Sequence, residues 1–120
     1  MNELELKAFK EVLVQIEEVV NDENKADING RTYQLTKMTH KQRLPFLQYY
    51  QDMQNGKESM NFDKIENMLA PYVMFDGAIL KNLPNHFDKY PADYMAYINT
   101  FLLVVNYPFL SENLSSFKGL

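Results

Sequence analysis

The stretch PADYMAYINTFLLVVNYPFL, residues 91–110, decides the fold of this chain. Its apolar residues recur at helical spacing and form a stripe that three more residues widen to most of the circumference. A helix that is apolar on nearly all sides is usually central and buried. Pro91 suits a first helical position, where a missing amide costs nothing, and we expect the helix to end before Pro108. A loose tail is expected over residues 111–120.

Three further segments have helical patterns. Residues 1–20 form an amphipathic N-terminal segment with one apolar stripe. Residues 39–54 begin with Thr39 and Gln42 at the spacing of a capping box. Pro45 lies inside that second pattern, so its helix either begins near Leu44 or is kinked there. The third helix begins near Phe62 and bends or ends at Pro71, and Asp63 with Glu66 has cap-like spacing at its start.

Two short segments connect these helices in different ways. Asn29-Gly30 favours a tight turn, so residues 27–36 are predicted to form either a small β-hairpin or an extended arm. Asp76-Gly77 marks a second turn, and the residues from Ala78 to Leu83 are expected to form a short helical piece. The stretch LPNHFDKYPADY, residues 83–94, contains two prolines and is interpreted as a stiff joint that precedes the last helix. The sequence therefore predicts a mainly α, single-domain bundle of about four to five helices.

Composition narrows the class of protein. The chain has 120 residues, 46% of them hydrophobic, and contains no cysteine, which excludes disulfides and thiolate chemistry. No apolar run approaches the roughly 20 residues that a membrane span requires, so we expect no contact with a membrane. The net charge of −4 argues against general nucleic-acid binding.

The residues that carry chemistry do not form a catalytic pattern. His86 lies in the joint without a second histidine nearby, which fits neither a triad nor a zinc site. His40 lies in the basic segment KMTHKQR, which is interpreted as a phosphate-binding patch with Tyr33 for stacking, as a solvated basic face or as a patch that faces an acidic neighbouring subunit. We therefore expect no enzyme, no cofactor and no metal.

Charge is distributed unevenly along the chain. Residues 1–30 carry eight acids and three bases, a net −5, whereas residues 31–60 carry two acids and five bases, a net +3. Opposite charges on two parts of one chain favour association between copies. The candidate basic patch for self-association consists of Arg31, Lys37, Lys41 and Arg43.

Several phrases of the sequence resemble one protein family. The phrases are INGRTYQLTKMTHKQR, residues 28–43, and FDGAILKNLPNHFDKYPADYMAYINTFLLVVNYPFL, residues 75–110. They are similar to tail assembly chaperones of long-tailed phages and prophages of Gram-positive bacteria. The resemblance spans roughly residues 28–110 and leaves the N-terminal helix outside the pattern. It implies a small, mostly helical fold without catalytic residues.

The resemblance also implies a function and partners. Such chaperones coat the hydrophobic helical tape measure protein, recruit tail tube subunits and leave before the virion matures. They act in the cytoplasm of the bacterial host, and many are also made in a longer, frameshifted form. We expect a homo-oligomer whose copies hold the client by helix-in-groove contacts. The candidate client-facing residues are Phe46, Tyr49, Tyr50, Tyr94 and Tyr97.

A second function class remains open from the sequence. Seven methionines, eight phenylalanines and eight tyrosines are a large apolar supply for a small domain, and exposed Met and Tyr form adaptable binding surfaces. A small helical inhibitor or adaptor that binds one folded target has the same composition. Self-assembly, or co-purification with a long helical client, distinguishes the chaperone from the inhibitor.

Overall fold

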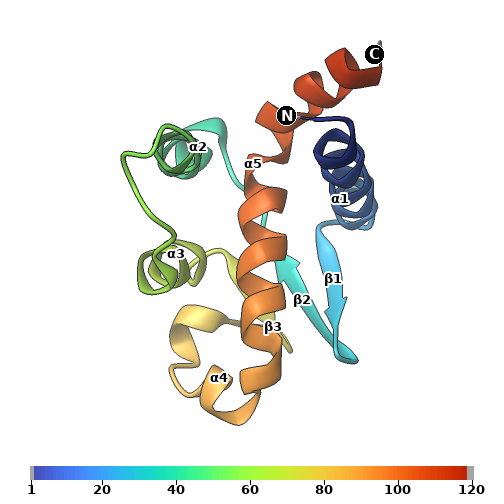
Figure 1. Ribbon diagram of the computed structural model, residues 1–120. Helices are drawn as coiled ribbons and strands as arrows, with labels where there is room; N and C mark the ends of the chain where they lie inside the picture. The colour runs from blue at the N-terminus through green and yellow to red at the C-terminus, as the bar shows by residue number, and fades with distance from the viewer. Residues whose placement is uncertain (1, 119–120) are drawn as a thin grey trace.

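A computed structural model describes residues 2–118 of the chain, with side chains as far as Ser111 (Figure 1). In this range the chain is 64% helical, with five α-helices and a small antiparallel sheet of four strands, which confirms the mainly α prediction. The elements in order are α1 Glu3–Asn21, β1 Lys25–Ile28, β2 Arg31–Leu35, α2 His40–Gln54, α3 Phe62–Leu69, β3 Val73–Phe75, β4 Ala78–Ile79, a 3₁₀ turn Leu80–Asn82, α4 His86–Lys89, a 3₁₀ turn Pro91–Asp93 and α5 Tyr94–Lys118.

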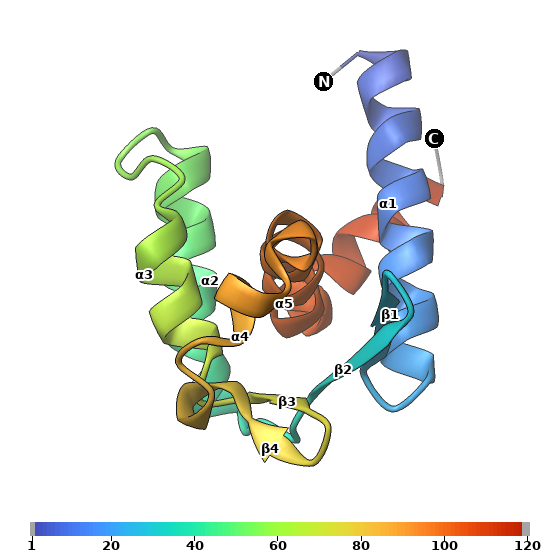
Figure 2. The same ribbon diagram turned by 90° about the horizontal axis from the view of Figure 1, so that it is seen from below.

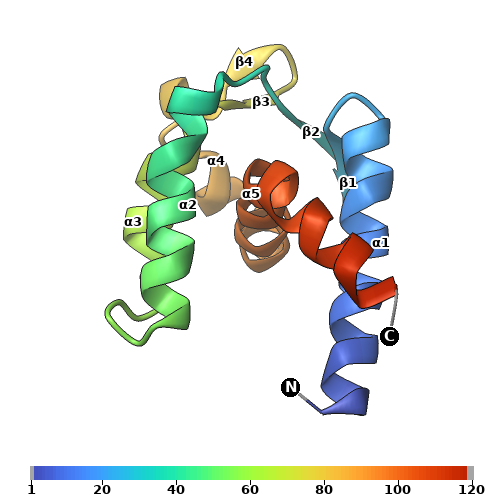
Figure 3. The same ribbon diagram turned by 90° about the horizontal axis from the view of Figure 1, so that it is seen from above.

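Helix α5 is the axis of the fold. Figures 2 and 3 show it between α1 on one side and α2 with α3 on the other, while the sheet crosses a third side. Tyr97, Ile98, Phe101 and Val105 of α5 are fully buried, as its sequence predicts. The main core joins these residues to buried side chains from all the other α-helices except α4 and from three strands, among them Ile16, Tyr33, Phe46, Ile65 and Val73.

The sheet consists of two hairpins joined edge to edge. Asn29 and Gly30 have φ values of 54° and 81°, and Asp76 and Gly77 have 51° and 79°, so both turns have the two positive φ angles of a type I′ turn. The strand order is β1-β2-β3-β4, with Tyr33 opposite Phe75 between the hairpins. The first hairpin was one of the two predicted alternatives. The expectation of a helical piece after Asp76-Gly77 is wrong for residues 78–79, which form β4, and right for the 3₁₀ turn that follows.

The helix starts mostly follow their capping signals. Thr39 and Gln42 form the predicted capping box, with Gln42 N donating to Thr39 Oγ1 at 3.2 Å. Helix α2 begins at His40 despite Pro45, which lies exposed inside it. Helix α3 differs from the prediction, because its cap is Asn61, whose Oδ1 accepts from Lys64 N at 3.1 Å. The Asp63–Glu66 pair is therefore not the cap.

The C-terminal half of α5 corrects one prediction. The helix does not end before Pro108 but continues through it, and its backbone is helical to Lys118. Figure 3 shows the last turns bending towards α1. Proline removes the amide that would bind the carbonyl four residues earlier, here Val104. Arg43 of α2 compensates, because its Nη1 donates to Val105 O at 2.6 Å and lies 3.5 Å from Val104 O.

The predicted loose tail, residues 111–120, lies mostly outside the part of the structure in which side chains are described. Ser111 is partly buried, and the side chains of residues 112–118, together with residues 119–120, lie outside the described part of the structure. The N-terminal helix is as expected: α1 starts in a capping box between Asn2 and Glu5 and buries Leu13 and Ile16. Its Val12, which the sequence placed in the apolar stripe, is 40% exposed.

Candidate functional site

A buried ion pair holds the first hairpin against the start of α5. Arg31 of β2 binds Asp93 with both ends of its guanidinium, Nε to Oδ2 at 2.6 Å and Nη2 to Oδ1 at 2.7 Å. The Asp93 side chain is fully buried, and that of Arg31 is 29% exposed. A bidentate arginine–carboxylate pair fixes geometry as well as charge. The pair therefore sets where the hairpin lies relative to the central helix.

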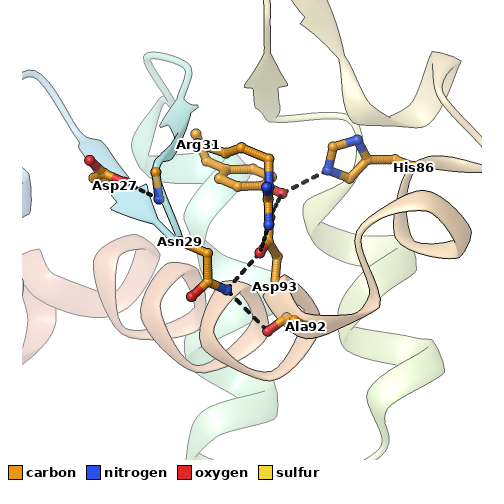
Figure 4. A network of polar contacts seen from close by, with 8 residues as sticks. Asp27, Asn29, Arg31, His86, Ala92 and Asp93 are labelled. Atoms are coloured by element: carbon orange, nitrogen blue, oxygen red, sulfur yellow. Dashed lines mark hydrogen bonds and ion pairs between the residues drawn. The ribbon is translucent and has the colours of Figure 1, made fainter.

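Three more side chains complete this polar network, as Figure 4 shows. Tyr33 Oη donates to Asp93 Oδ2 at 2.6 Å, and Asn29 Nδ2 donates to Asp93 Oδ1 at 2.8 Å. His86 Nε2 lies 2.7 Å from the same tyrosine oxygen. The network thus connects the first hairpin to α4 and to the turn before α5, and both oxygens of Asp93 are used.

The electrostatics of the network follow from these contacts. The hydrogen bonds from Arg31 hold the pKa of Asp93 well below its usual value, against the effect of burial. Burial raises the pKa of Tyr33, and its hydrogen bond to Asp93 raises it further. Burial also lowers the pKa of His86, so the imidazole is neutral at pH 7. A tyrosine that keeps its proton is a poor nucleophile, and the network is suited to positioning rather than to catalysis.

The sequence reasoning anticipated the joint but missed this network. Residues 83–94 do form a compact joint, with short helical turns on either side of Tyr90. By its sequence position, Asp93 is only an acid at the start of a helix. The available signal was the alternation in β2, which places Arg31 on the same face of the strand as the buried Tyr33. Nothing in the local pattern of either segment indicates a pair 62 residues apart.

Most of the five candidate client-facing residues lie in the interior. Phe46, Tyr49 and Tyr97 are only 2%, 3% and 0% exposed, so their assignment to a binding surface is corrected. Tyr49 Oη donates to Ser59 O at 2.8 Å and thereby fastens the loop between α2 and α3. Tyr50 is partly buried against the small cluster formed by Leu13 and Leu110. These side chains stabilise the fold.

Tyr94 is the candidate that remains near a surface. It is partly buried, and its ring lies 6.3 Å from that of Phe62, at the start of α3. Burial raises the pKa of Tyr94 to about 12. Phe62 is 39% exposed and the neighbouring Met95 is 51% exposed. We call Phe62, Tyr94 and Met95 the α3–α5 patch.

The structure separates the four residues of the candidate basic patch. Arg31 and Arg43 are bound within the chain, to Asp93 and to Val105 O. Their partners are twelve residues apart, which is about 18 Å along a helix. Lys37 and Lys41 are exposed. The sequence patch is therefore not one surface, and only its two lysines are available to another molecule.

Other exposed apolar side chains lie on α1 and α2. Leu4, Val12 and Val14 on α1 are 79%, 40% and 50% exposed, and Leu44 on α2 is 41% exposed. In the described part of the chain, no three histidine, cysteine, aspartate or glutamate side chains come together as a metal site. None of the helices in residues 2–118 is long and apolar enough to cross a membrane.

Searches against protein families, curated proteins and solved structures found no match to this chain.

Proposed function

We propose that this chain is a tail assembly chaperone of a long-tailed phage or prophage of a Gram-positive bacterium. In this role it binds the hydrophobic helical tape measure protein in the host cytoplasm, helps to recruit tail tube subunits and is absent from the mature virion. The proposal rests on the resemblance of residues 28–110. A small helical domain with exposed apolar side chains is compatible with it.

The observation that best supports the proposal is where the resembling phrases lie in the fold. The first phrase contains Arg31, Tyr33 and Arg43, and the second contains His86, Asp93 and Val105. These residues bind one another across the two phrases. The resemblance therefore covers the framework that places the hairpin, α2 and α5, which is the part that relatives of one fold need to share.

The client surface of this proposal is the α3–α5 patch rather than the buried aromatics. Phe62 and Tyr94 are in ring contact, and Met95 follows Tyr94 in the chain and is exposed, so the patch offers aromatic and thioether groups suited to adaptable binding of apolar helices. Self-association then depends on Lys37 and Lys41 of one copy and on the acidic residues 1–30 of another. A longer, frameshifted form belongs to the same proposal.

The first experiment is to sequence the DNA that follows the coding sequence. A slippery site with an overlapping frame, followed by a long gene for helical repeats, is the expected result. That downstream product is then co-expressed with this chain, and its soluble fraction is measured. The double variant Phe62→Gln/Met95→Gln should lose the solubilising effect, while the matched control Leu4→Gln/Val14→Gln should keep it.

Two results contradict the proposal. A locus with neither a second frame nor a long helical gene removes the tail-assembly context. A chain that stays monomeric by light scattering and leaves the downstream product insoluble points instead to an inhibitor or adaptor of one folded target.

A further inference from the structure

An open pocket of about 450 Å³ lies between the β3–β4 turn and the joint before α5. Half of its ten lining residues are apolar or aromatic, and the polar half includes Asn82, Asn85 and His86, which has only 7% of its surface exposed. The His86 ring is 4.4 Å from that of Phe75 and 5.1 Å from that of Tyr90, measured between centroids. Leu83 and Pro84 complete the apolar lining.

The hydrogen-bond chain fixes the protonation of the His86 ring. Tyr33 has one hydroxyl proton, and that proton is donated to the ionised Asp93. The oxygen of Tyr33 can then only accept from His86, so Nε2 carries the imidazole proton. In the neutral ring, Nδ1 is therefore an acceptor with a free lone pair.

This second ring nitrogen has no hydrogen-bond partner in the described part of the chain. Among the described side chains, which end at Ser111, the polar atoms that are both unpaired and sealed from solvent are Tyr97 Oη and Asn106 Oδ1. Nδ1 of His86 is not one of these atoms, so it is not sealed from solvent, and His86 lines the pocket. Figure 4 shows it on the side of the ring away from Asp93. A fixed acceptor in an aromatic pocket selects a ligand that brings a donor.

Two charged side chains, Lys89 and Asp76, line the pocket. Lys89 lies 5.7 Å from the centroid of the Tyr90 ring and forms no ion pair with any residue of the described range. Asp76 lies on the β3–β4 turn. An acidic group on a ligand is attracted to Lys89 and repelled by Asp76.

We propose that this pocket binds a small aromatic acid with an O–H or N–H donor on its ring, the donor directed at His86 Nδ1 and the acid at Lys89. The ring packs against Phe75 and Tyr90, and both polar ends find partners. This site is separate from the α3–α5 patch, and it does not depend on the chaperone proposal.

Three probes separate the contributions to binding. 4-Hydroxybenzoate carries both groups, benzoate lacks the donor and phenol lacks the acid. Binding is followed by ¹⁵N NMR of the His86 ring, because Nδ1 shifts when its lone pair accepts a hydrogen bond. We expect 4-hydroxybenzoate to move the Nδ1 resonance, and benzoate to bind about tenfold more weakly without moving it.

Exposed lysines supply variants that leave the folded network intact. Lys89→Gln should weaken 4-hydroxybenzoate about threefold and leave phenol unchanged, because an exposed ion pair contributes little. Lys57→Gln, in the loop after α2, is the matched control and should change neither. Equal affinity for 4-hydroxybenzoate and benzoate overturns the proposal, as does an Nδ1 resonance that stays in place up to the solubility limit of the probe, which leaves water as the only occupant.

Discussion

The two ends of the buried part of α5 are each fastened by an arginine from another element, but in different ways. At the N-terminal end, Arg31 binds the fully buried carboxylate of Asp93. Asn29 and Tyr33 donate to the same carboxylate, and His86 binds the hydroxyl of Tyr33. At the other end, Arg43 binds main-chain carbonyls next to Pro108. The first contact neutralises a charge, whereas the second supplies a side-chain donor to the carbonyls of Val105 and Val104, of which Val104 lacks its backbone donor.

The same type of side chain thus serves two purposes in this fold. A buried carboxylate without its cation is very costly, so the Arg31 end depends on the pair as a unit. A carbonyl beside a proline costs only an unsatisfied hydrogen bond, so the Arg43 end depends on one residue compensating for another. Substitutions at the two ends should therefore differ in size, in pH dependence and in coupling.

The largest effect is expected at Asp93. The substitution Asp93→Asn removes the charge and leaves the guanidinium of Arg31 without its partner, which should lower the free energy of unfolding by about 3 kcal/mol. Urea denaturation at pH 7 measures the change. Asp88→Asn, on the exposed side of α4, is the control and should change stability by less than about 0.5 kcal/mol. Equal effects of the two substitutions would mean that the pair does not hold the hairpin.

A smaller effect is expected at Arg43. Arg43→Met keeps most of the apolar stem but leaves Val105 O and Val104 O without their donor, at a cost of about 1–2 kcal/mol. The cost should shrink in a Pro108→Ala background, where an amide returns to the helix. A double-mutant cycle by urea denaturation measures this coupling. Additive effects would show that Arg43 and Pro108 act independently.

The sequence predicts those elements whose pattern lies within one segment, and it fails where an element depends on contacts with a distant segment. Helices α1, α2 and α5 follow from periodicity and caps that lie within each segment, and the first hairpin follows from Asn29-Gly30. Strands β3 and β4 have three and two residues, too few to show alternation. Helix α5 continues through Pro108, and the side chain that binds carbonyls of the preceding turn, Arg43, comes from a different helix.

The candidate sites were harder to predict for the same reason. A helical pattern identifies an apolar face but does not show what covers it. Phe46 and Tyr49 are on the face of α2 that meets the core, so they are buried rather than available to a client. Arg31 and Asp93 meet only because the hairpin folds onto the start of α5. Tertiary contacts of this kind leave no trace in either segment alone.

The pH dependence should distinguish the two ends of α5. Burial lowers the pKa of His86 below the ordinary value of 6.5. The charges of Arg31 and Lys89 also lower this pKa, and the charge of Asp93 raises it by less than burial lowers it. As pH falls through 6.5, the unfolded chain binds a proton that the folded chain does not, so stability decreases. We therefore expect the free energy of unfolding to decrease as pH falls below about 6.5.

Two histidine variants test this assignment by urea denaturation at several pH values. His86→Gln should flatten the slope, whereas His40→Gln, at the exposed start of α2, should not. Asp93 changes the pH dependence only in a more acidic range. Its pKa is lowered from 3.8, so its stabilising effect is present above that value and is lost as pH falls further. An unchanged slope in His86→Gln would mean that the histidine is not part of the pH response.

The finest comparison is between two fully buried tyrosines of the core, whose ring centroids are 5.9 Å apart. Tyr33 Oη has two partners in the network, whereas Tyr97 Oη is sealed from solvent without a partner in the described part of the structure. An unsatisfied buried hydroxyl carries a desolvation cost, and removing it without changing the ring relieves that cost.

Tyr33→Phe should therefore lower the free energy of unfolding by about 1.5 kcal/mol, and Tyr97→Phe should raise it by about 0.5 kcal/mol. Opposite signs from one chemical change would locate the effect in the hydroxyl's partners, whereas two losses of similar size would show that Tyr97 has a partner of its own, such as an internal water.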